Sequence, residues 1–587
     1  MDTNSTQRIM LINPWDYAYE GKVTKSLSQA YLQMPYNVVL LASRLESKGL
    51  PVCFVDLFPV LIKGQGKVEV CFSLLQEKID AFRPDVIGIT FTTKQVMEAN
   101  RILEHCRNHA VSNNLEITFV AGGIHATVEP MFTLSVMKFD YVFMGEAENG
   151  IVDIGRGVPF EEIKGVTSLK SYDSSKKCFG EIVEDLDSLP FVDYSLCDLD
   201  FYTAPVFGES PPKKTLYSII ARGCVNRCGF CAYQRSKVRF RSVQHVIDEI
   251  KHTRKQYHFD RLRFLDSSIG MNRKLLLELC DNIKTQINDP DFEWYASIRS
   301  DQVDEELLRA MQESGCRHLF YGFESGSPST LKLMNKGCTV EQNKKVLKLH
   351  KKLNFPLSVY MILGYPGETE DDIKLTIKFI KENNTPDRYV VQWFKPWPGS
   401  ESYNTIFSNS GKDDLAQFKQ IGDSISGENV YANIGPGRFK QYFDHIDKYV
   451  RRRNSPSPKY RMMNLFDMQL EAENRNKINV LLIYDESIDE VFGNDFHRLD
   501  AHVRKKVKVI HCKIDKLDSV FEKRSFTDRL KSRLFDQNYA SIDWIHSSDG
   551  LILIASNRYK EILVQIREKY GFENDIFIYD GSHSLSN

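Results

Sequence analysis

The stretch Ala221-Arg-Gly-Cys-Val-Asn-Arg-Cys-Gly-Phe-Cys-Ala-Tyr233 gathers three cysteines into one short segment. Cys224, Cys228 and Cys231 form a CxxxCxxC pattern, and Phe230 stands directly before the third cysteine. A tight loop of this kind can direct three thiolates toward one iron–sulfur cubane. Three cysteines leave the fourth iron open to a ligand from outside the protein, as in catalytic metal sites. The spacing therefore predicts a cluster with one exchangeable position.

Two alternatives stay open for these cysteines on the spacing alone. Zinc sites usually combine two CxxC or CxxH halves, and the chain has no second CxxC. Ferredoxin-type sites use two-residue gaps and a fourth cysteine followed by proline, and that pattern is also absent. Zinc binding and an ordinary place in the core are thus the weaker interpretations.

Residues 215–400, which contain this stretch, alternate apolar runs with helical patterns. Six runs are expected to form buried strands: Thr215–Ala221, Arg261–Leu265, Phe292–Ile298, His318–Phe323, Leu357–Leu363 and Tyr389–Phe394. The helices between them have clear starts, because Thr339 with Gln342 and Thr369 with Asp372 fit the capping-box pattern. Six strand–helix units predict a partial (β/α)6 TIM-type barrel, in which chemistry collects at the carboxyl ends of the strands.

The carboxyl ends of these expected strands hold polar residues. Asp266 follows the second strand, Ser297 and Arg299 lie at the end of the third, and Glu324 follows the fourth. Asp266 and Glu324 could each cap a helix, which would explain either acid singly. Their common placement beside the cysteine loop instead favours one binding site along the rim of the barrel.

The first 150 residues show a second strand–helix alternation. Strands are expected at Ile9–Asn13, Val52–Asp56, Asp85–Phe91 and Ile117–Ala121, with helical patterns at Tyr36–Lys48, Leu74–Phe82 and Lys94–Asn108. This order predicts a doubly wound, Rossmann-like parallel sheet. No GxGxxG follows the first strand, so a dinucleotide is not expected there.

Ligands of such sheets lie past the carboxyl ends of the strands. The candidate contacts at those ends are Thr92, Gly122, Gly123, Gly145 and Glu146. Glycines there let a ligand approach the backbone closely. The alternative is a generic scaffold whose glycines only make turns. His125, next to this group, is more typical of a hydrogen-bonding residue than of a metal ligand, although imidazole can be either.

The remaining segments carry weaker patterns. Residues 151–214 are expected to bridge the two sheets, and residues 401–475 to form a helical extension, around Gly437–Val450, and a linker. Residues 476–587 predict a small flavodoxin-like α/β domain with strands at Val480–Asp485, Val507–Cys512, Leu551–Ile554 and Ile576–Asp580, and helical patterns at Phe526–Gln537 and Tyr559–Lys569. Because no glycine-rich phosphate loop accompanies Asp485 or Asp580, scaffolding or partner docking is favoured for it.

Composition limits the partners and the compartment. The 587 residues include 77 Lys plus Arg and 78 Asp plus Glu, for a formal charge of −1. This balance gives no reason to expect nucleic acid or an anionic membrane as a partner, so Arg451–Arg453 is interpreted as a solvated helix end. Apart from the trio, the twelve cysteines are scattered. We therefore expect a reduced, cytoplasmic protein without disulfides, signal peptide or membrane helix.

These motifs together resemble the radical S-adenosylmethionine (SAM) enzymes. CxxxCxxC with an aromatic residue before the third cysteine resembles their cluster motif. Further matches to their barrel are Arg299–Met311, Gly315–Arg317, Gly322–Gly326, Asn335–Gly337, Ile362–Thr369 and Pro396–Gly399. The first domain, with Gly122–Thr127 and Gly145–Glu148, is similar to the cobalamin-binding domain of one large branch. The resemblance covers roughly residues 8–400.

The resemblance implies three cofactors. Cys224, Cys228 and Cys231 would hold a 4Fe–4S cluster, and SAM would bind its open iron. One electron, delivered by a flavodoxin or ferredoxin-type donor, would split SAM into methionine and a 5′-deoxyadenosyl radical. The polar contacts to SAM would come from Asp266, Ser297 and Glu324, with the Phe230 backbone near the adenine. Cobalamin would supply a methyl group, with Thr92, Gly122, Gly123, Gly145 and Glu146 around it.

Two departures from the family pattern bear on these roles. The first domain has Asp56-Leu-Phe-Pro-Val60 where a DxHxxG motif would supply a histidine ligand to cobalt. Histidine ligation from that loop is therefore not expected. The paired aspartates that follow the second barrel strand in the family appear here as Asp266-Ser267. The role of that loop is therefore open.

The favoured function is methylation of an unactivated carbon in a small-molecule substrate. A radical rearrangement or cyclisation with the same cofactors is the second hypothesis. An iron–sulfur or zinc protein that only binds or transfers electrons is the third, and it leaves Glu324 and Gly364–Glu368 unexplained.

Overall fold

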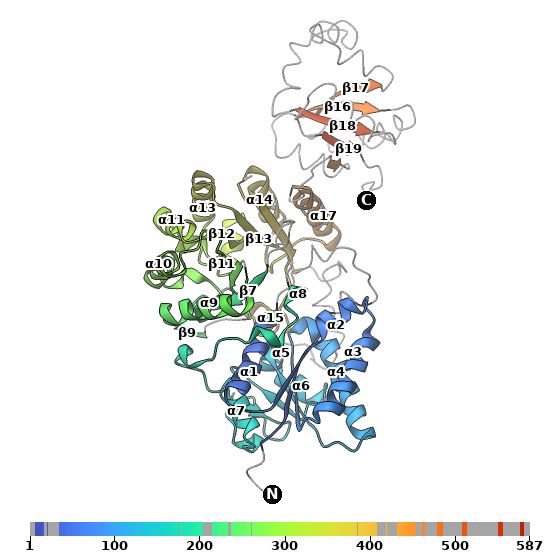
Figure 1. Cartoon of the computed structure of the whole chain (residues 1–587). Helices are drawn as coiled ribbons and strands as arrows, with labels where there is room; N and C mark the ends of the chain where they lie inside the picture. Colours follow the sequence, from blue (N-terminus) through green and yellow to red (C-terminus); the bar gives the residue numbers. More distant parts are fainter. Residues whose placement is uncertain are drawn as a thin grey trace, which may run out of the picture. The chain divides into compact units, whose positions relative to one another are not determined.

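The computed structural model describes most of the first 453 residues and five strands beyond them. The described residues are 6–16, 20, 34–176, 178–202, 214–232, 236–259, 261–383, 385–407, 418, 431–453, 461–463, 478–484, 507–513, 550–555 and 576–579. They divide into two compact units, 1–436 and 437–587. Figure 1 shows the chain coloured along its sequence.

The N-terminal sheet has the strand order β2-β1-β3-β4-β5-β6, parallel except for β6, which is antiparallel to β5. Its strands are β1 Ile9–Asn13, β2 Val52–Asp56, β3 Val86–Thr90, β4 Thr118–Gly122, β5 Tyr141–Phe143 and β6 Val166–Thr167. The predicted parallel sheet is confirmed. Because the strand order reverses between β1 and β3, a ligand is expected beyond the carboxyl ends of these two strands.

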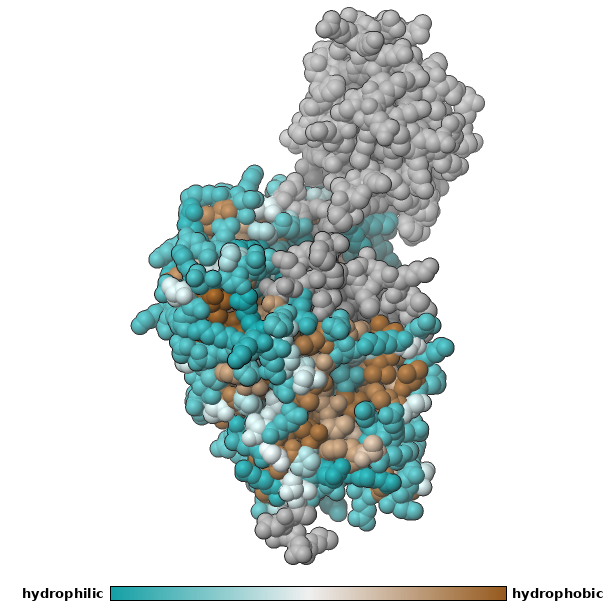
Figure 2. All heavy atoms as spheres, in the orientation of Figure 1, coloured by the Kyte–Doolittle hydropathy of each residue, from teal (hydrophilic) through white to brown (hydrophobic). Residues whose placement is uncertain are grey.

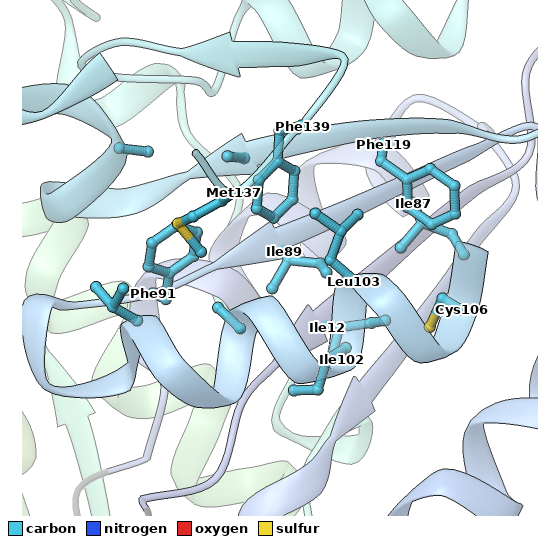
Figure 3. Close-up of a cluster of buried hydrophobic side chains, with 14 of the residues drawn as sticks. Ile12, Ile87, Ile89, Phe91, Ile102, Leu103, Cys106, Phe119, Met137 and Phe139 are labelled. Atoms are coloured by element: carbon cyan, nitrogen blue, oxygen red, sulfur yellow. The ribbon is translucent and has the colours of Figure 1, made fainter. Parts of the chain in front are cut away.

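Helices cover both faces of this sheet (Figure 1). They are α1 Tyr36–Ser47, α2 Leu57–Lys63, α3 Val68–Phe82, α4 Val96–Ser112, α5 Gly123–Val128, α6 Pro130–Ser135 and α7 Gly150–Gly155. Strand residues alternate between two cores, with Ile12 and Ile89 facing α3 and α4 and Leu11 facing α1. Figure 3 shows the first core, where Ile87, Ile89 and Phe119 meet Leu103 and Cys106 of α4.

The second sheet has six parallel strands in the order β7-β10-β11-β12-β13-β14. They are β7 Thr215–Ser218, β10 Arg261–Phe264, β11 Glu293–Ile298, β12 Cys316–Glu324, β13 Leu357–Leu363 and β14 Arg388–Trp393. Neighbours in the sheet are successive strand–helix units, which is the arrangement of a (β/α) barrel. The predicted partial barrel is confirmed.

The helices of this barrel lie along the outside of the curved sheet (Figure 1). They are α9 Val243–Tyr257, α10 Arg273–Asn282, α11 Glu305–Glu313, α12 Pro328–Leu333, α13 Val340–Leu353 and α14 Glu370–Glu382. Two further helices, α8 Leu199–Tyr202 before the first strand and α15 Glu401–Ile406 after the last, do not belong to this outer layer. The predicted capping boxes at Thr339 and Thr369 are present. Figure 2 shows mainly hydrophilic side chains over the barrel and more hydrophobic ones over the N-terminal domain.

The second unit contains helix α17 Pro436–Arg453 and a five-stranded parallel sheet in the order β15-β19-β18-β16-β17. Its strands are β15 Arg461–Met463, β16 Ile478–Tyr484, β17 Val507–Lys513, β18 Gly550–Ala555 and β19 Ile576–Tyr579. Taken from β16 to β19, the order 2-1-3-4 is that of flavodoxin-like sheets. Asp485, Asp580 and the helical patterns at 526–537 and 559–569 lie outside the described residues.

Candidate active site

The cysteine stretch begins on a separate hairpin. The single strand expected at Thr215–Ala221 is wrong, because the structure has β7 ending at Ser218 and a new strand, β8 Ala221–Cys224. β8 pairs antiparallel with β9 Ser236–Phe240 in a sheet of its own. Arg222 stands opposite Arg239, and the register shifts between Arg222 and Cys224. This bulge turns the chain from the hairpin into the cysteine loop.

Gly223 makes this bulge sterically possible. Its φ is +98°, and a Cβ at this position would lie 2.3 Å from the carbonyl oxygen of Lys237. Only glycine accepts both the positive φ and so close a backbone. The residue between Arg222 and Cys224 is therefore fixed by the geometry of the hairpin.

The loop after β8 is held against the rim of the barrel by backbone hydrogen bonds. The Gly229 N–H donates to Met334 O at 2.8 Å, and the Ser402 N–H donates to Gly229 O at 3.0 Å. A Cβ on Gly229 would lie 2.4 Å from the hydroxyl of Tyr365. Phe230 is half-buried against a small cluster of buried residues that includes Tyr365. The loop is thus packed tightly on its barrel side.

The three cysteines fit a cluster in their chemistry. Cys228 is buried, while Cys224 and Cys231 are partly exposed, as expected for ligands around a centre at the edge of a loop. The Cys231 N–H donates to Cys228 O at 3.0 Å, which closes a tight turn between these two residues. All three thiols are free of disulfides. Among the described residues, no three or more His, Cys, Asp or Glu side chains converge as a site for a single metal ion.

Two buried cations face Cys228. Arg299 Nη1 lies 3.9 Å from Cys228 Sγ, and Lys336 also acts on it electrostatically. Burial raises the pKa of the Cys228 thiol, and the charges of Lys336 and Arg299 oppose that rise. Thiolate is the form that binds iron, so the two cations favour the ligating state.

Arg299 is itself fixed by several acceptors. It donates to both carboxylate oxygens of Asp301 at 3.0 and 2.9 Å, to Lys336 O at 2.8 Å and to Cys338 Sγ at 3.1 Å. The guanidinium therefore joins the end of β11 to the segment after α12.

Glu324, the last residue of β12, is buried and paired. Lys336 Nζ donates to Glu324 Oε1 at 2.7 Å. The backbone of Glu324 has a φ of +67°, which is uncommon for a residue with a side chain. Such strain is typical of functional sites. Lys336 also lies 5.7 Å from the centre of the Phe230 ring, so the pair is next to the cysteine loop. Ser297 is half-buried on neighbouring β11.

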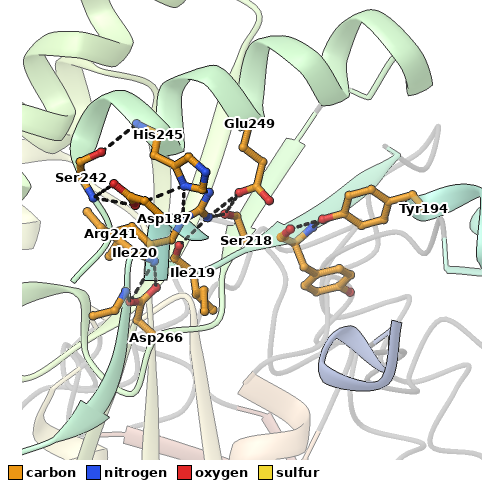
Figure 4. Close-up of polar contacts among 12 residues, drawn as sticks. Asp187, Tyr194, Ser218, Ile219, Ile220, Arg241, Ser242, His245, Glu249 and Asp266 are labelled. Atoms are coloured by element: carbon orange, nitrogen blue, oxygen red, sulfur yellow. Dashed lines mark hydrogen bonds and ion pairs between the residues drawn. The ribbon is translucent and has the colours of Figure 1, made fainter. Parts of the chain in front are cut away.

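Asp266 supports the start of the hairpin. Its carboxylate accepts the N–H of Ala221 at 2.6 Å and that of Ile220 at 3.2 Å. Burial raises the pKa of Asp266 to about 7, although these hydrogen bonds and Arg241 act in the opposite direction. Figure 4 shows this contact beside the buried pair Arg241–Glu249, whose atoms are 2.6 Å apart. Asp266, which was predicted to contact SAM, thus uses its carboxylate to accept backbone hydrogen bonds.

The alternative that Asp266 and Glu324 cap helices is wrong. The residue that precedes the short helix after β10 is Ser268, and the cap of α12 is Ser327, whose side chain accepts from the Thr330 N–H. Glu324 instead ends β12, and Asp266 lies two residues beyond the end of β10, as the rim interpretation requires.

The carboxyl edge of the N-terminal sheet presents glycines and hydroxyls. Gly123 has a φ of +91°, and a Cβ there would lie 2.7 Å from Phe91 O. Thr92 is exposed and caps the turn Thr93–Gln95, while Gln95 Nε2 donates to Pro14 O at 3.0 Å across the β1–β3 switch point. Gly122 ends β4 directly before Gly123. This edge therefore offers backbone to a ligand.

His125 lies in α5 and is fully buried. Its Nδ1 and Thr93 Oγ1 are hydrogen-bonded at 3.1 Å, which confirms the hydrogen-bonding interpretation. Burial lowers the pKa of His125 to about 3, so its imidazole is neutral. Its ring packs against Phe91, Phe132 and Phe418.

The acids after β5 contact the cysteine hairpin. Glu146 accepts two hydrogen bonds from Arg239, one of them at 2.9 Å, and lies 3.5 Å from Arg222. Glu148 lies 2.5 Å from Arg222 Nη2. Gly145, which precedes these acids, is exposed and has a φ of +89°. The structure thus gives the predicted cobalamin contact Glu146 two arginine partners.

Sequence patterns missed three cations of the site, although Arg299 was expected on the rim. Arg222 and Arg239 lie on the two strands of the hairpin, and Lys336 directly precedes Gly337, whose φ is +75°. Arginines on both strands of a hairpin are a usable signal, because like charges directly opposite each other need an acidic partner.

Comparison with known proteins agrees with this geometry. The radical SAM superfamily matches residues 218–380, and the B12-binding domain matches residues 35–154. The chain is 29% identical to an uncharacterized methyltransferase from Pyrococcus horikoshii over 58% of this chain and 73% of that protein. It is 26% identical to the anaerobic magnesium-protoporphyrin IX monomethyl ester cyclase of Rubrivivax gelatinosus, over 57% of this chain and 60% of that enzyme.

The fold is also that of a solved enzyme. The radical SAM methyltransferase TsrM from Kitasatospora setae, with tryptophan and a SAM analogue bound, aligns with a TM-score of 0.55 at 16% identity. The alignment covers 78% of this chain and 90% of that one.

The protein is therefore a radical SAM enzyme with an N-terminal B12-binding domain. More particularly, it is a cobalamin-dependent member of that superfamily. These domains show that its cofactors are a 4Fe–4S cluster, SAM and cobalamin. Radical SAM chemistry also requires a reductant. The hypothesis of a protein that only binds metal or transfers electrons is wrong. No helix within the described ranges is long and apolar enough to cross a membrane.

Proposed function

We propose that the enzyme methylates an unactivated carbon of a small metabolite in a cobalamin-dependent reaction. One observation carries the proposal: Glu146 and Glu148, at the carboxyl edge of the B12-binding sheet, contact the hairpin that leads into the cysteine loop. In this proposal the two cofactor edges are adjacent, and the residues of both belong to one compact unit. The similarity to methyltransferases supports the same reaction.

Each set of residues has a distinct task in this proposal. Cys224, Cys228 and Cys231 hold the cluster, and the charges of Arg299 and Lys336 favour the thiolate form of Cys228 against the effect of burial. When bound, the cluster and SAM supply a substrate-activating radical, and cobalamin supplies the methyl group. The protein holds these groups in position and excludes water.

The remaining candidates divide between SAM and cobalamin. Ser297, the Phe230 backbone and the Glu324–Lys336 pair border the space for SAM. Asp266 acts on SAM indirectly, because its carboxylate is engaged with Ile220 and Ala221. Thr92, Gly122, Gly123 and Gly145 would hold cobalamin at the edge of the sheet that they form. Glu146 supports this edge through its arginines. A flavodoxin or ferredoxin-type protein delivers the electron.

The test is a product balance under anaerobic conditions. Reconstituted enzyme receives cobalamin, a chemical reductant, methyl-deuterated SAM and a metabolite extract from the native host. Methylation yields S-adenosylhomocysteine and 5′-deoxyadenosine together with a deuterium-labelled product, all detected by mass spectrometry. The Cys228→Ala variant, which lacks a cluster ligand, forms neither 5′-deoxyadenosine nor labelled product. If the wild-type enzyme makes 5′-deoxyadenosine without S-adenosylhomocysteine, methylation is the wrong assignment.

A radical cyclisation is the second candidate, favoured by the 26% identity to the monomethyl ester cyclase. Its distinguishing result is 5′-deoxyadenosine with a product that carries no deuterium from the methyl group of SAM.

A further inference from the structure

The ion-pair network of Glu146, Glu148, Arg222 and Arg239 joins the B12-binding domain to the cysteine hairpin. Glu148 and Arg222 lie 2.5 Å apart, and Arg239 Nη1 lies 2.9 Å from Glu146 Oε2. The side chains of Arg239 and Glu148 are each 6% exposed, and that of Arg222 is 13% exposed. Charges this far removed from water are costly to separate from their partners.

The hairpin depends on these acids for its own stability. Arg222 and Arg239 are direct cross-strand neighbours, and like charges in that position repel each other. β8 and β9 form a two-stranded sheet, which is marginal when isolated. Glu146 contacts both arginines. The segment that carries Glu146 and Glu148, called the acidic loop below, therefore joins two mutually repelling arginines into a connected network of ion pairs.

The network also has a rigid attachment on the acidic side. The Val183 N–H donates to Glu146 Oε2 at 3.1 Å, and Arg239 Nη1 donates to Val183 O at 2.6 Å. Although burial raises the pKa of Glu146, the hydrogen bonds from Arg239 and the charge of Arg222 bring it below its ordinary value. The carboxylate is thus held in one orientation and in its charged form.

Position along the chain links this network to both cofactor edges. Arg222 precedes Cys224 by two residues, with only the constrained Gly223 between them. Glu146 directly follows Gly145 at the carboxyl edge of the B12-binding sheet. A displacement of the acidic loop is therefore transmitted to the cysteine loop through a short, stiff path.

We propose that Glu146 and Glu148 are positioning residues that set the cysteine loop against the B12-binding edge. This role goes beyond methyl transfer and is independent of the substrate. It rests on the assignment of the cluster to Cys224, Cys228 and Cys231.

The test is a charge exchange at the pair Arg222 and Glu148. The single variants Arg222→Glu and Glu148→Arg and the double variant are purified from full-length chain and reconstituted with iron, sulfide and cobalamin. SAM binding per cluster is measured from the change in the electron paramagnetic resonance spectrum of the reduced cluster, without substrate. We expect each single variant to lose about tenfold in SAM affinity per cluster, the effect typical of residues that orient metal ligands. The double variant should recover to within about threefold of wild type, because the exchanged charges attract again.

Lys237→Glu is the matched control. Lys237 lies on the same hairpin and pairs with Glu184, but both side chains are about 60% exposed, at 61% and 59%. This variant should leave SAM affinity unchanged, since exposed pairs contribute little.

The Glu148→Gln variant tests the proposal if the charge-reversal variants do not fold. Glu148→Gln keeps the size of the side chain and one acceptor, and we expect a loss of about threefold or more in SAM affinity per cluster. The proposal is overturned if folded Glu148→Gln and Glu148→Arg bind SAM with wild-type affinity per cluster. It is also overturned if the single variants lose affinity and the exchange restores none of it. If the enzyme does not methylate a substrate, the proposed function is wrong, but the differences in SAM affinity between these variants would still be observed.

Discussion

Lys336 donates a hydrogen bond to Glu324 at 2.7 Å, and each side chain is 8% exposed. Glu324 ends β12 with a φ of +67°, and Lys336 acts in addition on Cys228. A buried pair of this kind is rarely a net source of stability, but it is costly to break. Its location beside the cysteine loop indicates that it shapes the site.

The Lys336→Met variant should therefore be strongly destabilised. It leaves the Glu324 carboxylate buried without its cation, and the expected loss in the free energy of unfolding is about 3 kcal/mol. Denaturant unfolding of the apoprotein, followed by circular dichroism, measures the loss. The double variant Lys336→Met/Glu324→Gln should recover most of it. A double variant as unstable as the single one would contradict this account.

Replacement of Cys224, Cys228 and Cys231 by alanine should abolish the cluster. These are the three thiols of the loop, and a cubane cannot be held without them. The measurement is the iron and sulfide content after anaerobic reconstitution, with Cys178→Ala as control. Cys178 is exposed and distant in sequence from the loop, so its variant should retain a full cluster. A 4Fe–4S cluster in the triple variant would show that the assignment is wrong.

Asp266 should make the stability of the wild type depend on pH. Burial raises its folded pKa to about 7, whereas an unfolded aspartate titrates near 3.9. The folded state therefore holds this proton more tightly, and its contribution to stability is lost as the pH rises from about 4 through 7.

The Asp266→Asn variant tests this dependence, because asparagine keeps an acceptor for Ala221 and does not titrate. The free energy of unfolding of the wild type, relative to this variant, should be greater at pH 5 than at pH 8. Urea unfolding at the two pH values measures it. An unchanged difference would show that Asp266 keeps an ordinary pKa in the folded protein.

Gly123→Ala should impair cobalamin retention. The new Cβ would meet Phe91 O at 2.7 Å and would force a φ of +91° on alanine. The matched control is Gly49→Ala, since Gly49 has a φ of +67° but nothing within 4 Å of the added Cβ. Both variants carry about 1 kcal/mol of backbone strain, whereas only Gly123→Ala displaces the edge of the sheet. Absorbance of cobalamin retained after gel filtration distinguishes them. Equal retention of cobalamin by the two variants would show that Gly123 is not part of the cobalamin site.

Local patterns were sufficient for most of the elements and for the class of enzyme. Most strands of both main sheets and the capping boxes at Thr339 and Thr369 follow from residue periodicity and short-range hydrogen bonds. The two sheets and the partial barrel follow from the order of these elements, because parallel strands need crossover helices. The cysteine spacing indicated the cluster, since its ligands come from one short loop.

Only the tertiary structure decided which partners the polar residues have. Glu146 and Arg239 are 93 residues apart, and Asp266 lies 45 residues from Ala221. No local pattern encodes such pairs, so Asp266 and Glu146 were expected to contact ligands, whereas in the structure they contact the hairpin. The break between β7 and β8 has the same origin, because the residue pattern of 215–221 does not reveal that its last residue pairs with a different strand. Sequence by itself thus determined most of the elements and the cluster motif through short-range forces. Long-range charge pairing and strand pairing determined how the motif is held.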